Sequence, residues 1–227
     1  MSAIDDDLLA DLVDAVRDLL KKEQQSERLR DVYLIGDIEK DSARATIERL
    51  RELAHGSQRP IKLYINSAGG NVTDGLALHD AIQEIVDSGI EISIIVQGMA
   101  YSMGSVVLQA ASPGKRFSFP HSWIMIHEPA KWAGWQSTTA AAQHLDRLKQ
   151  MQGQIYQIMS ARSGRPLKQI IRDTRRVDFY LDAWKAKEYG LIDEVIGAAV
   201  QPAASTLAEA VAEAAEPLVA ARERPPT

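Results

Sequence analysis

One pattern limits the fold of this chain more than any other: short apolar runs rich in β-branched residues alternate with longer stretches of helical periodicity. Strand, crossover helix and strand in succession predict an α/β fold with a mainly parallel sheet and right-handed connections. The strands are expected at 32–35, 61–65, 92–96, 116–119 and 123–126, and the helices at 41–54, 73–87, from 102 onward and 137–161.

The two ends of the chain differ from this central body. Leucine and valine side chains between residues 5 and 22 fall on one stripe, with aspartates at the start and lysines at the end. This pattern predicts an N-terminal amphipathic helix. From residue 198 the composition shifts to Ala, Glu and Pro, which is typical of a loosely structured tail. We therefore predict a helix and polar connector over 1–31, a single α/β domain over 32–197 and a tail over 198–227.

Composition and charge exclude several classes of protein. With no cysteine, the chain has no disulfide, no thiolate zinc site and no cysteine nucleophile. A net charge of −5 without a long basic cluster argues against a nucleic-acid partner. The apolar runs are too short to span a membrane, and the acidic start does not resemble a secretory signal. We therefore expect a cytoplasmic protein. We also expect no metal site, since no H-E-x-x-H or similar ligand spacing occurs.

Two small-residue segments follow predicted strands. Ser102 lies in G-M-A-Y-S-M-G, at a strand-to-helix turn where a serine either acts as a nucleophile or caps the helix. Gly69 and Gly70 lie in N-S-A-G-G-N, where unobstructed backbone N–H groups suit an oxyanion, a phosphate or a plain turn. No Walker A or G-x-G-x-x-G pattern supports nucleotide binding.

Among the five histidines, His127 is the strongest functional candidate because it ends an apolar strand, where open α/β sheets place functional groups. A histidine base paired with Ser102 needs an acid to orient it. Spacing alone does not select that acid. Four aspartates near the C-terminal end of the domain remain candidates, namely Asp173, Asp178, Asp182 and Asp193.

Five segments together resemble the Clp protease proteolytic subunit (ClpP) family, across about 32–196. Residues 63–70, L-Y-I-N-S-A-G-G, are similar to the family's L-Y-I-N-S-P-G-G, and 98–104 resemble its G-x-A-A-S-M-G nucleophile segment. Residues 124–129, I-M-I-H-E-P, resemble its I-M-I-H-Q-P, while 172–174 and 188–193 match its R-D-T and E-Y-G-L-x-D segments. The resemblance implies a ClpP or crotonase-like fold of repeated strand–helix units.

The resemblance also implies roles for individual residues. Ser102 would be the nucleophile and His127 the general base. Aligning backward from 188–190 places the acid on Asp178, whereas aligning forward from 173–174 reaches Val177, which cannot orient an imidazole. Asp173 is the fallback acid. The implied oxyanion hole is the backbone N–H groups of Gly70 and Met103, and the implied substrate-binding residues are Gly69, Asn71, Pro129 and Ala130.

The function implied by the resemblance is a serine endopeptidase that forms an acyl-enzyme inside an oligomeric ring, heptameric or related, with no cofactor. Its partners would be peptides or unfolded proteins, other copies of the chain and, as an open question, an ATP-dependent unfoldase. The alternatives are a non-catalytic structural subunit, a CoA-ester enzyme on the same scaffold, and a ClpP-like membrane or phage-processing peptidase.

Overall fold

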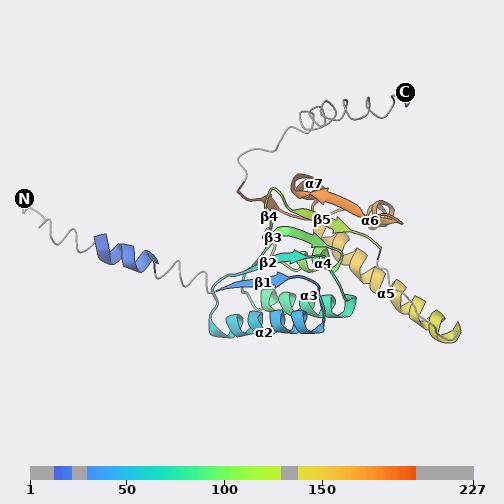
Figure 1. The fold of residues 1–227 in the computed structure, drawn as a ribbon, viewed down its shortest axis with the longest axis horizontal. Helices are drawn as coiled ribbons and strands as arrows, with labels where there is room; N and C mark the ends of the chain where they lie inside the picture. The colour runs from blue at the N-terminus through green and yellow to red at the C-terminus, as the bar shows by residue number, and fades with distance from the viewer. Residues whose placement is uncertain (1–12, 22–29, 129–137, 198–227) are drawn as a thin grey trace, which may run out of the picture. The chain divides into compact units, whose positions relative to one another are not determined.

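The computed structural model describes residues 13–21, 30–128 and 138–197 (Figure 1). Residues 13–21 are helical, inside the stretch where an N-terminal amphipathic helix is predicted. The rest of that helix, most of the polar connector and the predicted tail lie outside the described residues. Within the described part of the chain, no helix is both long and apolar enough to cross a membrane.

The described elements follow the alternation that the sequence predicts, with more elements near the C-terminal end of the domain. In chain order they are β1 (Asp31–Ile35), α2 (Lys40–Gly56), β2 (Ile61–Ser67), α3 (Val72–Asp87), β3 (Ile92–Tyr101), α4 (Met103–Leu108), β4 (Arg116–Ser118), β5 (Trp123–Ile126), α5 (Thr138–Ser163), α6 (Leu167–Thr174), β6 (Phe179–Asp182), α7 (Ala183–Tyr189) and β7 (Glu194–Val195).

The sheet is parallel except at one pair of strands. Its main order is β1-β2-β3-β4-β7, with β5 joined to β3 and β6 joined to β5. The first half of β3 pairs with β4 and its second half pairs with β5, so this long strand belongs to two diverging branches. Strands β5 and β6 are antiparallel. The mixed α/β architecture confirms the predicted fold class.

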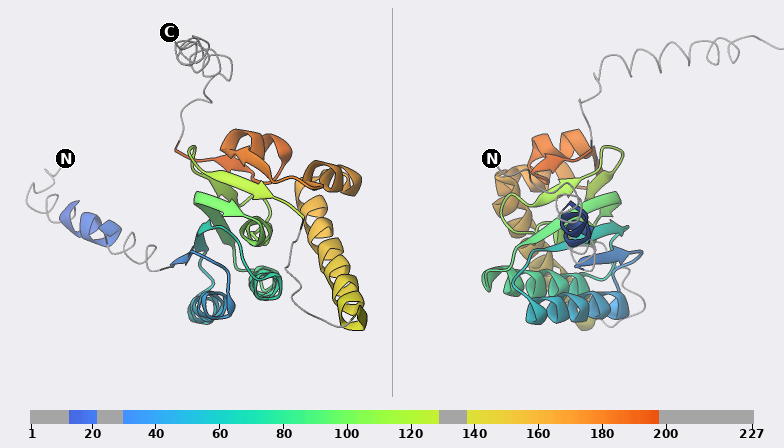
Figure 2. Two further views of the ribbon diagram at one scale, coloured as in Figure 1. Left: turned by 45° about the vertical axis from the view of Figure 1, so that its right-hand side comes forward. Right: turned by 90° about the vertical axis from the view of Figure 1, so that its left-hand side faces the viewer.

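The core lies where the central strands meet the helices. Leu63 and Ile65 of β2 and Ile92 and Ile94 of β3 are fully buried. Each such side chain contributes about 1.5–3 kcal/mol through removal of apolar surface from water. Helices α2 and α3 run side by side against one face of the sheet (Figures 1 and 2). Every residue of α4 is buried, which fixes the turn that precedes it.

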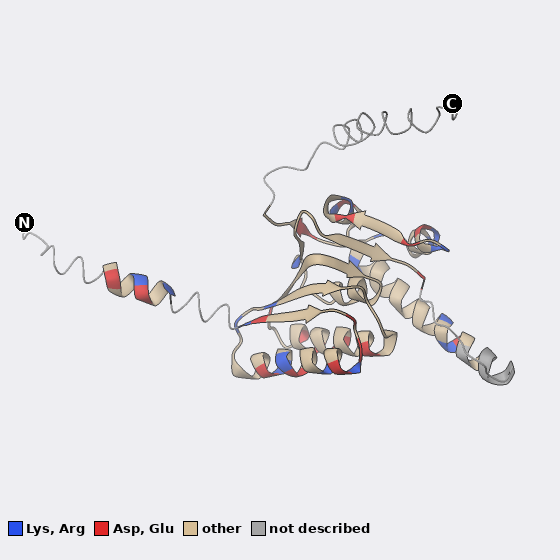
Figure 3. Ribbon diagram, in the orientation of Figure 1, with Lys and Arg blue, Asp and Glu red and all other residues tan. Residues whose placement is uncertain are grey.

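A buried ion pair ties β4 to the segment that follows α7. Arg116 Nη2 and Nε donate to the Asp193 carboxylate, at 2.6 and 3.1 Å, and Arg116 Nη1 donates to the Gln109 side chain and to the Gly190 carbonyl. The Arg116 side chain is 7% exposed and that of Asp193 is 24% exposed. By contrast, α2 carries charges of both signs at its surface (Figure 3), including Arg51, which pairs with Glu84 at 2.7 Å in an exposed position.

Asp193→Ala is expected to lower the free energy of unfolding by about 3 kcal/mol, because it leaves the buried Arg116 charge without its partner. Glu84→Ala, the control at an exposed pair of similar length, is expected to lower it by about 0.5 kcal/mol. Urea unfolding of both variants at neutral pH measures the difference. Equal losses would show that burial of the Arg116 pair does not matter.

The difference in the free energy of unfolding between wild type and Asp193→Ala should depend on pH in a defined direction. Burial raises the pKa of the Asp193 carboxyl, but hydrogen bonds from the Arg116 side chain and backbone outweigh it and lower the pKa overall. The contribution of Asp193 to stability is therefore fully present above its unfolded pKa, about 4. It is lost as the pH falls through the lower folded-state pKa. The free energies of unfolding of wild type and Asp193→Ala should therefore become more alike in acid.

Candidate active site

Ser102 stands at the junction of β3 and α4 in a strained backbone conformation. Its φ of 51° and ψ of −120° lie outside the regions that L-residues ordinarily adopt. Although Ser102 occupies the N-cap position of α4, its side chain makes no capping hydrogen bond. Its backbone N–H donates to the Met125 carbonyl of β5 and so ties the turn to that strand. The strained strand-to-helix turn thus exposes the hydroxyl instead of using it to start the helix.

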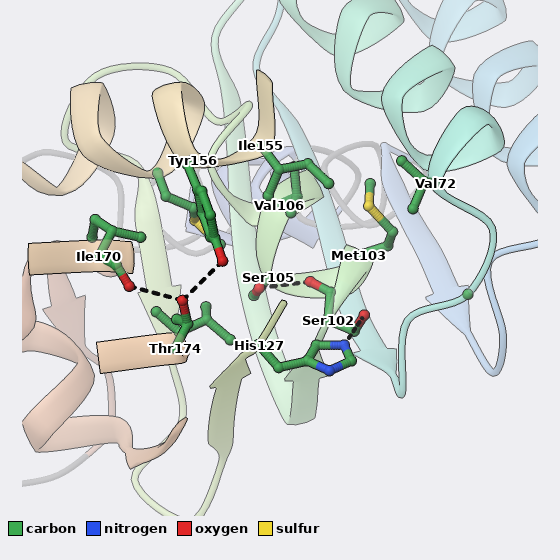
Figure 4. Close-up of a pocket in the computed structure, with 13 residues that line it drawn as sticks. Val72, Ser102, Met103, Ser105, Val106, His127, Ile155, Tyr156, Ile170 and Thr174 are labelled. Carbon is green, nitrogen blue, oxygen red and sulfur yellow. Dashed lines mark hydrogen bonds between the residues drawn. The ribbon is translucent and has the colours of Figure 1, made fainter. Parts of the chain in front are cut away.

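His127 meets that hydroxyl because of how β3 and β5 pair. Tyr101 lies opposite Met125 in this parallel pair, so the two strands end side by side with Ser102 and His127 just beyond them. The distance from Ser102 Oγ to His127 Nε2 is 2.7 Å (Figure 4). The imidazole is 26% exposed. This is the geometry in which an imidazole nitrogen accepts the proton of a serine hydroxyl.

Asp178 lies on the other side of the same imidazole. Phe179 pairs with Ile126 across the antiparallel strands β6 and β5, so the next residues, Asp178 and His127, face each other. Asp178 Oδ1 is 3.5 Å from His127 Nδ1, longer than an ordinary hydrogen bond, and the aspartate side chain is 55% exposed.

The other three candidate aspartates have different partners. Asp182 caps α7 by accepting from the Lys185 backbone N–H, and Asp193 pairs with Arg116. Asp173 accepts from the Tyr189 hydroxyl at 2.9 Å and from Arg172 at 3.0 Å. Of the four, Asp178 is the one whose carboxylate is found beside His127.

The Asp173–Tyr189 contact braces the segment around Asp178. Burial raises the pKa of the Tyr189 phenol, and the neighbouring Asp173 carboxylate raises it further. Burial alone would raise the pKa of Asp173, but hydrogen bonds from Tyr189 and Arg172 lower it overall. The pair therefore stays as a neutral phenol donating to a carboxylate. The Tyr189 ring also packs on the Phe179 ring, with centroids 5.3 Å apart.

The glycine turn lies directly against the serine turn. A Cβ on Gly69 would lie 2.7 Å from Ser102 Cβ and 2.9 Å from the Met103 backbone nitrogen. Gly70, with φ of 145°, forms a parallel bridge with Ile38, in which the Ile38 N–H donates to the Gly69 carbonyl and the Asn71 N–H donates to the Ile38 carbonyl. The Gly70 N–H takes no part in that bridge, and the Met103 N–H is the first of α4 and has no partner within its helix.

Two of the four residues predicted to bind substrate lie in the described part of the chain. Gly69 provides the close packing just described, and the Asn71 side chain caps α3 by accepting from the backbone N–H groups of Thr73 and Asp74. Pro129 and Ala130 lie outside the described residues.

A largely apolar pocket opens beside the Ser102–His127 pair (Figure 4). It has an empty volume of about 530 Å³, part of which is open to solvent. Its apolar wall consists of Val72, Met103, Val106, Ile126, Ile155, Met159 and Ile170, while the hydroxyls of Tyr156 and Thr174 meet 3.2 Å apart. Part of this wall comes from α5 and α6, which the sequence did not connect with the site. The sequence feature that could have indicated this wall is the four-residue spacing of Ile155 and Met159, which places both apolar side chains on one face of α5.

Among the described residues, no group of three His, Asp or Glu side chains is arranged to hold a metal ion. Comparison with known proteins then decides the family, because the model of the Clp protease family matches residues 17–199. The chain belongs to the Clp protease family. The ATP-dependent Clp protease proteolytic subunit 1 of Gloeobacter violaceus is 40% identical over 168 residues, which cover 74% of this chain and 83% of that protein.

The glycine turn of this Clp protease family member gives a testable prediction. In Gly70→Ala the new Cβ would clash with the Ile38 carbonyl oxygen, so the turn must move and carry the residue-70 N–H away from Ser102. If that N–H stabilises an oxyanion, peptide hydrolysis should fall by about 10²- to 10³-fold in kcat. Gly89→Ala is the matched control, because Gly89 also has a positive φ, of 93°, but no atom lies within 4 Å of the added carbon. Similar kcat values for the two variants would contradict the role of Gly70.

Proposed function

We propose that this chain is a serine endopeptidase that cleaves peptide bonds through Ser102, His127 and Asp178. The observation that carries the proposal is the 2.7 Å contact between Ser102 Oγ and His127 Nε2 at a strained strand-to-helix turn. Strain of this kind is retained where the surrounding structure holds it in place, commonly at functional sites. Membership of the Clp protease family supports the same reaction.

In the proposed reaction, Ser102 Oγ attacks the carbonyl carbon of a peptide bond while His127 Nε2 accepts the hydroxyl proton. The tetrahedral oxyanion is stabilised by the backbone N–H groups of Gly70 and Met103. His127 then gives its proton to the leaving amine as the C–N bond breaks, which leaves an acyl-enzyme. Water, deprotonated by His127, attacks the acyl carbonyl, and His127 then returns that proton to Ser102 Oγ as the acyl–oxygen bond breaks and the second product leaves.

Asp178 and the apolar pocket complete the proposed site. The Asp178 carboxylate keeps the proton of neutral His127 on Nδ1 and stabilises the imidazolium that forms during attack. The pocket wall formed by Met103, Val106 and Ile155 suits an apolar side chain of the acyl part of the substrate. The reaction requires no metal or organic cofactor.

We also propose that the active form is a ring of identical chains, heptameric or closely related, that encloses the sites in a chamber. The support is the relative named a proteolytic subunit of an ATP-dependent protease. Sedimentation of the purified chain is expected to give about seven times its 25.0 kDa mass, or a multiple of that. Such a chamber would take peptides or unfolded proteins, with an ATP-dependent unfoldase as the proposed supplier of the latter.

A fluorophosphonate probe tests the proposed chemistry directly, because it forms a covalent bond with an activated serine. The full chain should be labelled, and peptide mapping should place the label on Ser102. Ser102→Ala should abolish labelling, whereas Ser88→Ala, at an exposed serine after α3, should not. A folded wild-type ring that remains unlabelled would instead favour a non-catalytic structural subunit.

A further inference from the structure

Among the described residues other than glycine, two have a positive φ: Ser102, at 51°, and Arg176, at 62°. Arg176 is the second residue after α6, where the left-handed conformation commonly ends a helix and glycine usually provides it. Elsewhere this chain follows that preference, with Gly89 after α3, Gly164 after α5 and Gly190 after α7. The arginine is therefore an exception, and it lies two residues before Asp178.

The chain is anchored on the N-terminal side of Arg176. Thr174, the last residue of α6, is 1% exposed, and its hydroxyl bonds to the Ile170 carbonyl and to the Tyr156 hydroxyl. The adjacent Asp173 is held by the Tyr189 hydroxyl. The end of α6 is thus attached to both α5 and α7.

The chain is anchored again immediately after Asp178. Phe179 pairs with Ile126 and packs on Tyr189, and the Tyr180 ring meets the Tyr101 ring edge-on at a centroid distance of 5.4 Å. Four residues, 175–178, therefore join two fixed points. Residues 175 and 176 form a turn in which Arg175 is extended, with φ of −69° and ψ of 112°, and Arg176 is the left-handed residue.

We propose that Arg176 is a positioning residue, whose left-handed backbone turns the chain so that Asp178 lies opposite His127. This inference rests on the proposed function, since it assigns Arg176 an effect on catalysis through Asp178. The side chains of residues 175–178 are exposed, so packing of the link itself does little to hold Asp178 in place. The backbone conformation at Arg176 and the two anchors set its position instead.

Arg176→Val tests the proposal, because a β-branched residue strongly disfavours a positive φ. We expect kcat for a short peptide to fall by about tenfold to a hundredfold, with KM little changed, as a misplaced catalytic group produces. Arg176→Gly should retain full activity because glycine adopts this conformation without strain. Arg175→Val is the matched control. It removes the same charge from an extended neighbour and should change kcat by less than about twofold.

A double-mutant cycle separates positioning from general damage. If Arg176 acts through Asp178, then Arg176→Val should have no further effect on kcat in an Asp178→Asn background. An equal loss in both backgrounds, or no loss in the wild-type background, would overturn the proposal. Fluorophosphonate labelling distinguishes the two levels of failure: an unlabelled wild type contradicts the proposed function, whereas a labelled wild type with an unaffected Arg176→Val contradicts only this inference.

Discussion

His127→Ala is expected to lower kcat/KM for peptide hydrolysis by about 10⁴- to 10⁶-fold, because Ser102 loses the group that accepts its proton. The 2.7 Å contact of His127 Nε2 with Ser102 Oγ is the contact that the substitution removes. Hydrolysis of a fluorogenic peptide, measured over a range of substrate concentrations, gives the ratio. The rate of fluorophosphonate labelling should fall in parallel, since the same proton transfer activates the serine.

His121→Ala is the matched control for that experiment. His121 is an exposed histidine in the turn before β5, six residues before His127, which follows the same strand. Its replacement should leave kcat/KM unchanged. If both variants lost activity equally, the loss would reflect damage to the β5 segment, and if neither did, His127 would not be the base.

Asp178→Asn is expected to lower kcat/KM by about 10³- to 10⁴-fold, because an amide neither fixes the tautomer of His127 nor stabilises its charged form. The 3.5 Å separation and the 55% exposure of Asp178 place the expectation toward the lower end of that range. The asparagine has almost the same shape, so the unfolding midpoint should change little. Peptide hydrolysis and thermal unfolding measured on the same preparation provide both numbers.

Asp173→Asn provides the comparison, since Asp173 is the other acid that the sequence left open. Its carboxylate faces Tyr189 and Arg172, so its loss should affect stability more than kcat/KM. The reverse outcome, with Asp173→Asn nearly inactive and Asp178→Asn nearly normal, would reassign the acid.

The sequence predicted the pairing of Ser102 with His127 better than the position of the acid, and the reason is topological. Both residues follow strands of a parallel sheet, and the carboxyl ends of neighbouring parallel strands lie at the same edge. The order of apolar runs therefore placed both residues after strands at that edge, and the resemblance to the ClpP family assigned them as nucleophile and base. The contact itself, at 2.7 Å, follows from the pairing of Tyr101 with Met125.

The acid depended on a feature that local sequence does not reveal. Strand β6 is four residues long, and its pairing with β5 joins segments more than fifty residues apart. A shift of that register by one residue would place Val177 opposite His127 and turn every side chain of β6 to the other face. The sequence also did not reveal the pocket wall from α5 and α6, because helix packing against a distant turn depends on tertiary contacts.

The three residues of the proposed site are held by parts of the fold that differ in stability, and this affects how the protein loses activity on warming. Ser102 and the segment before His127 are held by a strand in the middle of the sheet, whereas Asp178 depends on a short exposed link between α6 and β6. Segments with few buried contacts open at lower free energy than the sheet around them. Mild heat should therefore slow turnover before the sheet melts, and cooling should restore it. Inactivation in this range would be reversible, with the nucleophile and its base still in place.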